Sequence, residues 1–289
     1  MNTLYQGDNL TILKSLPDAS VDLIATDPPF NTGKDWGAFS DKWEGGLKGY
    51  LKFMEQRAIE MHRVLKGTGS LYLHCDPTAS HYLKVMLDGV FGIDNFKCEI
   101  VWKRNFGKSN DMKSTFGTEH DIILFYSKTA DNAFTSVYEP YREEYIKQFF
   151  KHVDKDGRRY AQQFSGGHRN TKQWRKRKYL DESKGVKVGS LWIRKLQLSP
   201  MAKERLGYPT QKPIALYERI IKASSNQGDI VLDPFAGSGT TLDAAQTLGR
   251  RWIGIDQSIE AINVIQARLR DRHGLEYDRD YQRITYKGR

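Results

Sequence analysis

The sequence predicts an α/β fold in which helices cover both faces of a mostly parallel sheet. Short apolar runs typical of buried strands alternate with segments whose apolar residues recur at helical spacing. Two of the runs end at an aspartate, Asp27 and Asp256. Because ligand sites of parallel sheets lie at the carboxyl ends of the strands, these two aspartates are candidate site residues. With 289 residues, 39% of them hydrophobic, the chain can bury a substantial core and is too apolar to be intrinsically disordered.

Residues 1–139 begin this alternation. Apolar residues between Leu51 and Leu65 recur at every third or fourth position, which predicts the buried face of a helix. Strands are predicted by the apolar runs at 23–25, 70–75 and 122–126.

Residues 209–289 resume the same pattern. One helix is expected to begin at Pro213 and another after Ser258, which can cap it. Between them, strands are predicted at 230–232 and 252–255, joined by a helix from Thr240 to Leu248. This order of strands and helices favours parallel pairing.

The formal charge of +10 is concentrated in the middle of the chain. Residues 140–208 hold 18 Lys and Arg against 7 Asp and Glu, a net charge of +11, whereas 1–139 and 209–289 carry −3 and +2. The middle segment also has weak periodicity and a dense basic run from His168 to Lys178. We therefore expect a distinct basic region that binds a polyanion.

Several classes of protein are not expected. The sequence shows no membrane-spanning apolar stretch and no secretory signal, so we expect a cytoplasmic protein. Cys75 and Cys98 are too few for a disulfide framework or a four-ligand zinc site. His74 and His81 add no third and fourth ligand at metal spacing, so no metal is predicted.

A glycine-rich loop, Asp233–Thr241, stands between a predicted strand and a predicted helix. Gly237 and Gly239 allow a tight turn and close approach of a ligand, and the helix start offers free N–H groups. Asp256 follows at the end of the next strand, near the offset at which an acid binds ribose hydroxyls. A simple tight turn and a dinucleotide site are alternatives, but Leu242 replaces the third fingerprint glycine. A ligand with adenosine and no pyrophosphate fits better.

The sequence Asp27-Pro28-Pro29-Phe30 is a second candidate site. Two successive prolines stiffen the chain as it leaves the sheet and expose its carbonyls. The Asp27 carboxylate and the Pro28 carbonyl can accept the two protons of an exocyclic amino group whose ring stacks on Phe30. The nitrogen can then attack an electrophilic methyl group, with positioning and electrostatics as the source of rate. A proline-rich turn is the structural alternative.

These motifs resemble those of the amino-methylating DNA methyltransferases, which use S-adenosyl-L-methionine. Residues 27–30 match the family's catalytic motif, with Phe30 where Tyr is commoner. The cofactor motif is matched by Asp233, Phe235, Ala236, Gly237, Ser238, Gly239, Thr240 and Thr241. A third motif, which also lines the cofactor site, is matched by Thr210, Gln211, Lys212 and Pro213.

The order of the motifs resembles the beta class, a circular permutation of the Rossmann-like methyltransferase fold. The resemblance implies a mostly parallel seven-stranded sheet, with 1–139 and 209–289 as permuted halves of a catalytic domain. Residues 140–208 would be an inserted target-recognition region. Residues 3–5 would form the strand beside 252–255, with Asp8 facing the cofactor adenine. The two main motifs would meet at the topological switch point of the sheet.

The activity that the resemblance implies is site-specific methylation of adenine N6 in double-stranded DNA, on a base flipped out of the duplex. Members with Asp at the first motif position usually methylate adenine, and members with Ser usually methylate cytosine N4. Cytosine-N4 methylation, an RNA or protein methyltransferase, and a non-catalytic DNA-binding partner remain alternatives.

Contacts with DNA are expected from the basic run, where Trp174 could also take part, and from a polar loop after Trp102. The candidates are Arg169, Lys172, Arg175, Lys176, Arg177, Lys178, Lys103 and Arg104. Residues 31–46 are expected to form either a lid over the site or a packed surface loop. A cognate restriction endonuclease, a homodimer and association with the nucleoid are further expectations.

Overall fold

The computed structural model describes residues 1–35, 40–104, 116–164, 175–193, 196, 202, 204–208 and 210–286. The chain forms two compact units, a larger one of residues 1–135 and 190–289 and a smaller one of residues 136–189. Among the described residues, no helix is long and apolar enough to cross a membrane.

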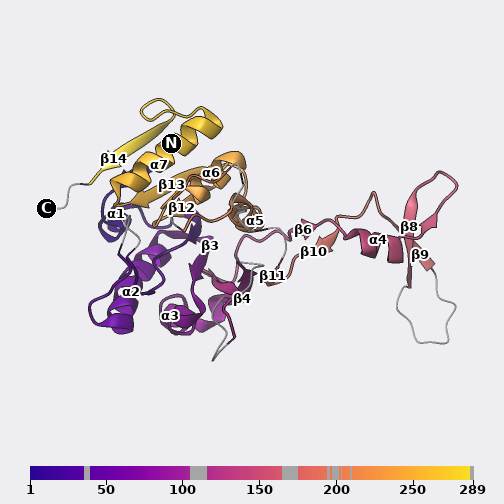
Figure 1. Cartoon of the computed structure of the whole chain (residues 1–289), viewed down its shortest axis with the longest axis horizontal. Coiled ribbons are helices and arrows are strands. Elements are labelled where there is room, and N and C mark those ends of the chain that lie inside the picture. The colour runs from indigo at the N-terminus through magenta and orange to yellow at the C-terminus, as the bar shows by residue number, and fades with distance from the viewer. Residues whose placement is uncertain are drawn as a thin grey trace. The chain divides into compact units, whose positions relative to one another are not determined.

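A nine-stranded sheet is the centre of the larger unit (Figure 1). Its order is β11-β4-β5-β3-β2-β12-β13-β1-β14. The strands are β1 (Asn2–Gln6), β2 (Val21–Thr26), β3 (Leu65–Cys75), β4 (Phe96–Lys103), β5 (His120–Ser127), β11 (Leu191–Trp192), β12 (Ile230–Asp233), β13 (Arg251–Asp256) and β14 (Tyr281–Thr285). β5 pairs antiparallel with both β3 and β4, and the other pairs are parallel.

The expected mostly parallel sheet is confirmed, but the expected number of seven strands is wrong for the described residues. β11 adds an edge beside β4, and β14 adds the opposite edge beside β1. Neither edge strand has the long apolar run of a buried strand, and β11 has only two residues, so periodicity did not reveal them. The predicted pairing of residues 3–5 with the strand at 252–255 is confirmed, with Leu4 opposite Gly254.

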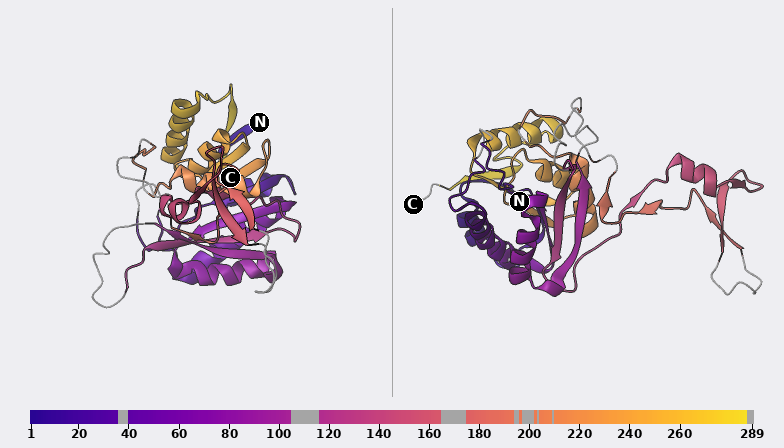
Figure 2. Two further views of the ribbon diagram at one scale, coloured as in Figure 1. Left: turned by 90° about the vertical axis from the view of Figure 1, so that its right-hand side faces the viewer. Right: turned by 60° about the horizontal axis from the view of Figure 1, so that its bottom comes forward.

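Helices cover both faces of this sheet. One face is covered by α1 (Asn9–Ser15), α2 (Gly46–Val64) and α3 (Pro77–Phe91), and the other by α5 (Ile214–Ser224), α6 (Thr240–Thr247) and α7 (Ile259–His273) (Figures 1 and 2). A 3₁₀ turn, Ile93–Asn95, follows α3. The helical face predicted between Leu51 and Leu65 points inward, since Met54, Ala58 and Met61 are fully buried in the core.

The smaller unit consists of short elements. β7 (His152–Val153), β8 (Arg159–Phe164) and β9 (Arg175–Tyr179) form an antiparallel sheet, β6 (Tyr138–Glu139) pairs with β10 (Val186–Lys187), and α4 spans Glu143–Phe149. The boundaries of this unit, 136 and 189, differ from the expected 140 and 208. Residues 191–192 belong to the larger unit because β11 pairs with β4. The recognition role of residues 140–208 stays a prediction.

Candidate active site

The two main motifs lie side by side at the edge where the parallel strands end. β2 pairs with β12, with Leu23 opposite Val231 and Ile24 opposite Leu232. The predicted meeting of the motifs is therefore confirmed, although Thr26 and Asp233 are 207 residues apart. The Thr26 hydroxyl donates to Asp233 Oδ1 at 2.9 Å. β2 and β12 are neighbours in the sheet, and the strands that follow them in sequence, β3 and β13, lie on opposite sides of this pair. The Thr26–Asp233 pair therefore lies at the topological switch point of the sheet.

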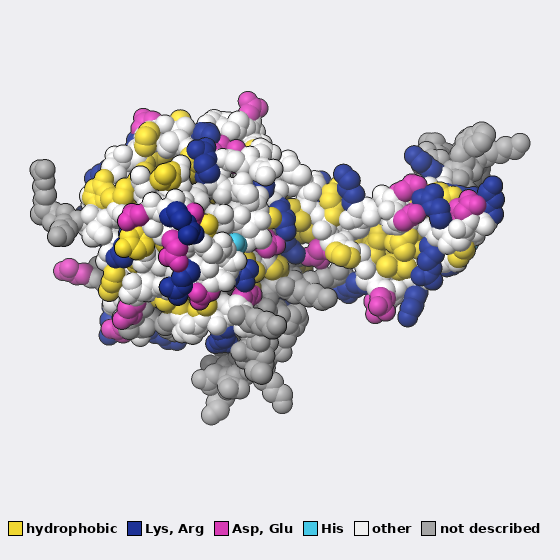
Figure 3. Space-filling view, turned by 90° about the horizontal axis from the view of Figure 1, so that it is seen from above, with side chains coloured by type: hydrophobic (Ala, Val, Ile, Leu, Met, Phe, Trp, Pro, Cys, Tyr) yellow, Lys and Arg dark blue, Asp and Glu magenta, His cyan; other side chains and the backbone are white. Residues whose placement is uncertain are grey.

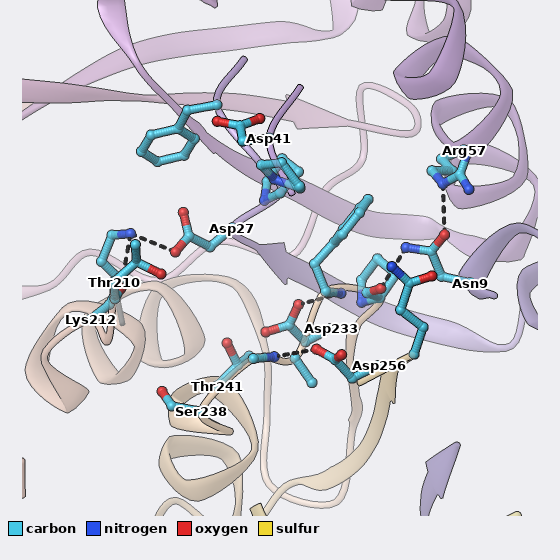
Figure 4. A pocket seen from close by; sticks show the side chains of 18 of the residues that line it. Asn9, Asp27, Asp41, Arg57, Thr210, Lys212, Asp233, Ser238, Thr241 and Asp256 are labelled. Atoms are coloured by element: carbon cyan, nitrogen blue, oxygen red, sulfur yellow. Dashed lines mark hydrogen bonds and ion pairs between the residues drawn. The ribbon is translucent and has the colours of Figure 1, made fainter. Parts of the chain in front are cut away.

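A cavity of about 370 Å³ opens at this edge of the larger unit (Figure 4). Its lining includes most of the predicted site residues: Asp8, Asp27, Pro28, Pro29, Phe30, Thr210, Gln211, Lys212, Asp233, Phe235, Ala236, Gly237, Ser238, Thr240, Thr241 and Asp256. Pro213 and Gly239 are not part of the lining. Pro213 caps α5, and Gly239, at φ 74°, allows close approach to α7, since a Cβ there would lie 2.9 Å from Ile265 Cγ1.

Asp256 connects the glycine-rich loop to the end of β13. Its Oδ2 accepts from the Gly237 N–H at 2.9 Å, and its Oδ1 accepts from the Ser258 N–H at 2.8 Å. Burial raises the pKa of this carboxyl above its ordinary value, and the N–H donors partly oppose that rise. The arrangement places one carboxylate, a positive-φ glycine turn and the start of α6 together.

Asp27 lines the same cavity as Asp256, with Lys212 at one carboxylate oxygen and His74 near the other. Lys212 Nζ donates to Oδ2 at 2.6 Å (Figure 4). His74 Nδ1 lies 3.1 Å from Oδ1. Burial alone would raise the pKa of Asp27, but Lys212 and His74 outweigh it and lower the pKa to about 2. The side chain is therefore a carboxylate at neutral pH.

Phe30 stands beside this carboxylate. The Lys212 ammonium lies 5.0 Å from the Phe30 ring centroid, and the His74 ring meets Phe30 edge-on at 5.2 Å. The Pro29 carbonyl accepts from the Tyr50 hydroxyl at 2.8 Å, which fixes the path of the proline pair. The cavity thus holds an anionic acceptor and an aromatic face next to each other.

Asp233 lies at the start of the glycine-rich loop and lines the cavity. It is 2% exposed and accepts from the Phe235 N–H at 3.0 Å as well as from Thr26. Burial raises its pKa to about 7 despite these donors. The loop is also held from α7, where Arg268 donates to the Ser238 carbonyl and the Thr240 hydroxyl.

Arg57 is a site residue that the sequence analysis missed. This buried guanidinium donates to Asp8 Oδ1 at 3.0 Å and to Asn9 Oδ1 at 2.6 Å, and Asn9 donates to the Pro234 carbonyl. Burial lowers the pKa of Arg57 to about 10, opposed by Asp8. In the sequence, Arg57 could have been recognised because it falls on the buried face of α2, where a cation needs an anionic partner.

The described residues of the loop 31–46 are packed against the site. Asp41, 1% exposed, accepts from the N–H groups of Asn31 and Thr32 and from the Trp43 indole. Trp43 packs on Phe53, with 4.4 Å between ring centroids. These contacts favour the packed-loop alternative, while Trp36 lies outside the described residues.

The predicted DNA contacts fall in two places. Lys103 pairs with Glu119, and Arg104 pairs with Asp121 at 2.8 Å at the end of β4. In the smaller unit, Lys176, Arg177 and Lys178 lie on β9, and Lys and Arg side chains gather on that unit (Figure 3). Arg175 begins β9, whereas Arg169, Lys172, Trp174 and residues 105–108 lie outside the described part of the chain. Within that part, no cluster of side chains suits a metal ion.

Comparisons with known proteins agree with this geometry. A DNA methylase family model, that of the N6 and N4 methyltransferases, matches residues 21–267. The chain is 34% identical to the type II methyltransferase M.HpaI of Haemophilus parainfluenzae, over 92% of this chain and 73% of that protein. It is 33% identical to the DNA adenine methyltransferase YhdJ of Escherichia coli K12, over 92% and 82%.

A solved structure shares the fold. The complex of M1.HpyAVI with S-adenosylmethionine superposes with a TM-score of 0.57 at 23% identity, covering 93% of this chain and 99% of that one. The family match spans the catalytic motif, the glycine-rich loop and the sheet that joins them. The chain therefore belongs to the N6/N4 family of DNA methylases, which are S-adenosylmethionine-dependent DNA amino-methyltransferases.

Proposed function

We propose that this protein transfers a methyl group from S-adenosylmethionine to the N6 atom of adenine at specific sites in duplex DNA. The observation that carries the proposal is the Asp27 carboxylate beside Phe30, which share a cavity with the glycine-rich loop and Asp256. A carboxylate at the first motif position supports adenine over cytosine. The name of the relative YhdJ also supports adenine.

The residues present fit the cofactor. Asp256 Oδ1 and Oδ2 already accept backbone N–H groups, and each retains a lone pair with which to accept a ribose hydroxyl proton. Asp8, with about half of its side chain exposed, can accept from the adenine amino group, while Phe53 and Phe235 supply apolar surface. Thr210, Gln211 and Lys212 close the cavity from the other side. When bound, the cofactor supplies an electrophilic methyl group on a sulfonium.

Asp27 would prepare the target nitrogen. Its Oδ2 accepts a proton of the N6 amino group, and Phe30 stacks on the flipped base, so the nitrogen lone pair is directed at the methyl carbon. As the new N–C bond forms, the methyl–sulfur bond would break and its electron pair would stay on sulfur, so the positive charge would pass to N6. Asp27 would then accept the proton that this nitrogen releases. The Lys212 ammonium occupies the donor position at Oδ2, so it shifts when the base enters.

Duplex DNA would be held by basic residues outside the cavity. Base flipping costs a few kcal/mol, which contacts between Lys or Arg and phosphates offset. Lys176, Arg177 and Lys178 of β9 are the candidates in the smaller unit. A paired restriction endonuclease, a homodimer and a location in the cytoplasm at the nucleoid are further parts of this proposal.

Methylation of a genome tests the assignment directly. The protein and its Asp27→Ala variant would be expressed in a host that lacks adenine methylation, and modified bases would be mapped by long-read sequencing. We expect N6-methyladenine at one sequence motif with the wild type and none with Asp27→Ala, while both bind S-adenosylmethionine. N4-methylcytosine instead would establish the cytosine alternative, and turnover by Asp27→Ala would refute the role of Asp27.

A further inference from the structure

His74 lies between two carboxylates, one of which, Asp27, lines the cavity. Its Nδ1 is 3.1 Å from Asp27 Oδ1, and its Nε2 is 3.2 Å from Asp121 Oδ2. The His74 side chain is 3% exposed and that of Asp121 is fully buried. The second oxygen of Asp121 accepts from Arg104 Nη1 at 2.8 Å. A line of four paired side chains therefore runs from the catalytic motif to the end of β4.

His74 Nε2 is hydrogen-bonded to Asp121, whereas Nδ1 and Asp27 Oδ1 lie at ion-pair distance but are not aligned as a hydrogen bond. A proton on Nδ1 is therefore what attracts the Asp27 carboxylate. A neutral ring has one N–H and one lone pair, so one lone pair would face a carboxylate oxygen. Burial lowers the pKa of His74, but Asp27 and Asp121 outweigh both burial and the nearby Lys212 cation and raise it above its ordinary value. The two carboxylates therefore make His74 harder to deprotonate than a free imidazole.

The ring is also held sterically. Phe30 meets it edge-on at 5.2 Å, and Trp102 meets it edge-on at 5.4 Å. Rotation of the ring would therefore disturb two aromatic contacts as well as two ion pairs. Because Phe30 packs against the same ring, one side chain fixes both the carboxylate and the proposed stacking surface.

We propose that His74, held by Asp121, is a positioning residue that binds Asp27 Oδ1 and leaves Oδ2 to accept the proton of the target amino group. The proposal rests on the proposed function. Once Lys212 has shifted to admit the base, a carboxylate without His74 could rotate about its Cβ–Cγ bond, and Oδ2 would no longer be fixed relative to Phe30. A misplacement of about 1 Å at a reacting group can lower a rate on the order of 100-fold.

Two substitutions separate positioning from packing. His74→Asn places an amide N–H near the position of Nδ1, so it keeps a donor toward Asp27 but cannot titrate. His74→Leu removes both donors and keeps a side chain of similar volume. His62→Asn is the matched control, because His62 lies on α2 and contacts Phe91 at 4.9 Å rather than the cavity.

The measurement is the single-turnover rate of methylation of unmethylated genomic DNA, at saturating tritiated S-adenosylmethionine, from pH 6 to 10. We expect His74→Leu to lose on the order of 100-fold in rate. His74→Asn should be at least about ten-fold faster than His74→Leu. In both variants, the dissociation constant for S-adenosylmethionine should stay within about two-fold of the wild-type value. His62→Asn should match the wild type.

The pH profile provides the second readout. In the wild type, the rate should fall as the pH rises through the pKa of His74, because the imidazolium loses its proton. Asp121→Asn should move this fall to lower pH, since a partner that raises the pKa is gone. His74→Asn should abolish it.

Two results would overturn the inference. One is a His74→Leu variant as active as the wild type, and the other is a His74→Asn variant whose rate still falls with rising pH as in the wild type. Weaker cofactor binding that accounts for the whole loss of rate would also overturn it. A wild-type protein that methylates no adenine would instead refute the proposed function, so the two failures are distinguishable.

Discussion

Lys212 Nζ donates to Asp27 Oδ2 at 2.6 Å, across 185 residues of sequence. The two side chains come from separate motifs, one after β2 and one before α5, and both line the cavity. The ammonium keeps Asp27 ionised and occupies the donor position that we assign to the target amino group. One contact thus connects the segment before α5 with the catalytic motif.

Replacement of Lys212 by Met should change how the methylation rate depends on pH. Lys212 is the strongest influence that lowers the pKa of Asp27 to about 2, so its loss raises that pKa. Activity that needs the carboxylate should then fall on the acid side at a higher pH than in the wild type. Single-turnover rates between pH 4.5 and 7 at saturating cofactor measure this shift. Lys222→Met, which removes an exposed ion pair with Glu218, should leave the profile unchanged.

Asp256→Ala should weaken the binding of S-adenosylmethionine. The variant loses the proposed ribose acceptor and the acceptor of the Gly237 N–H, so the glycine-rich loop is no longer tied to β13. We expect the dissociation constant to rise at least ten-fold by isothermal titration calorimetry, because a lost charge-assisted hydrogen bond costs about 1.5–3 kcal/mol. An unchanged constant would contradict the ribose role.

Arg268→Leu should destabilise the fold strongly. Arg268 is 1% exposed and donates to the buried Asp243 at 2.6 Å, so the variant leaves that carboxylate with Arg272 and His273 at its rim. Breaking a buried pair costs about 3–5 kcal/mol in free energy of unfolding, measured here by urea titration. Arg270→Leu, at an exposed ion pair with Asp271, should cost less than about 1 kcal/mol. Equal effects would mean that the buried pair is not the cause.

Neutralising Arg175, Lys176 and Arg177 should reduce the salt dependence of DNA binding. Each phosphate contact contributes about 0.9 to the slope of log K against log salt, so the slope should fall by up to about 3. Fluorescence anisotropy at several salt concentrations measures it, and cofactor affinity should not change. As a control, neutralising Lys222, Arg270 and Arg279 removes three cations from the larger unit. If the two triple variants had the same slope, β9 would not be the segment that contacts the DNA phosphates.

The motifs could be predicted from sequence because each is local. Asp27–Phe30 and the glycine-rich loop carry their geometry in consecutive residues, and both follow strands that apolar runs reveal. Their meeting followed from family resemblance, since no local pattern states that β2 pairs with β12. The edge strands β11 and β14 were missed because they lack the long apolar run of a buried strand.

The partners of Asp27 could not be predicted for a different reason. β5 runs antiparallel to β3, so its first residues, not its last, lie at the edge that holds the site. Asp121 therefore reaches His74. In a parallel sheet, site residues are expected at the carboxyl ends of strands, so a residue at the start of a strand was not considered. His74 itself was considered only as a metal ligand, because its neighbours in sequence gave no sign of two facing carboxylates.

The pairing of β2 with β12 also has a consequence for biosynthesis. Thr26 leaves the ribosome 207 residues before Asp233. At about 5–20 residues per second, the interval is about 10–40 s, during which one edge of β2 waits for its native neighbour. An open strand edge is a template for association with other chains. Yield in a cell is therefore sensitive to translation speed, temperature and chaperone supply during this interval, independently of the stability of the finished enzyme.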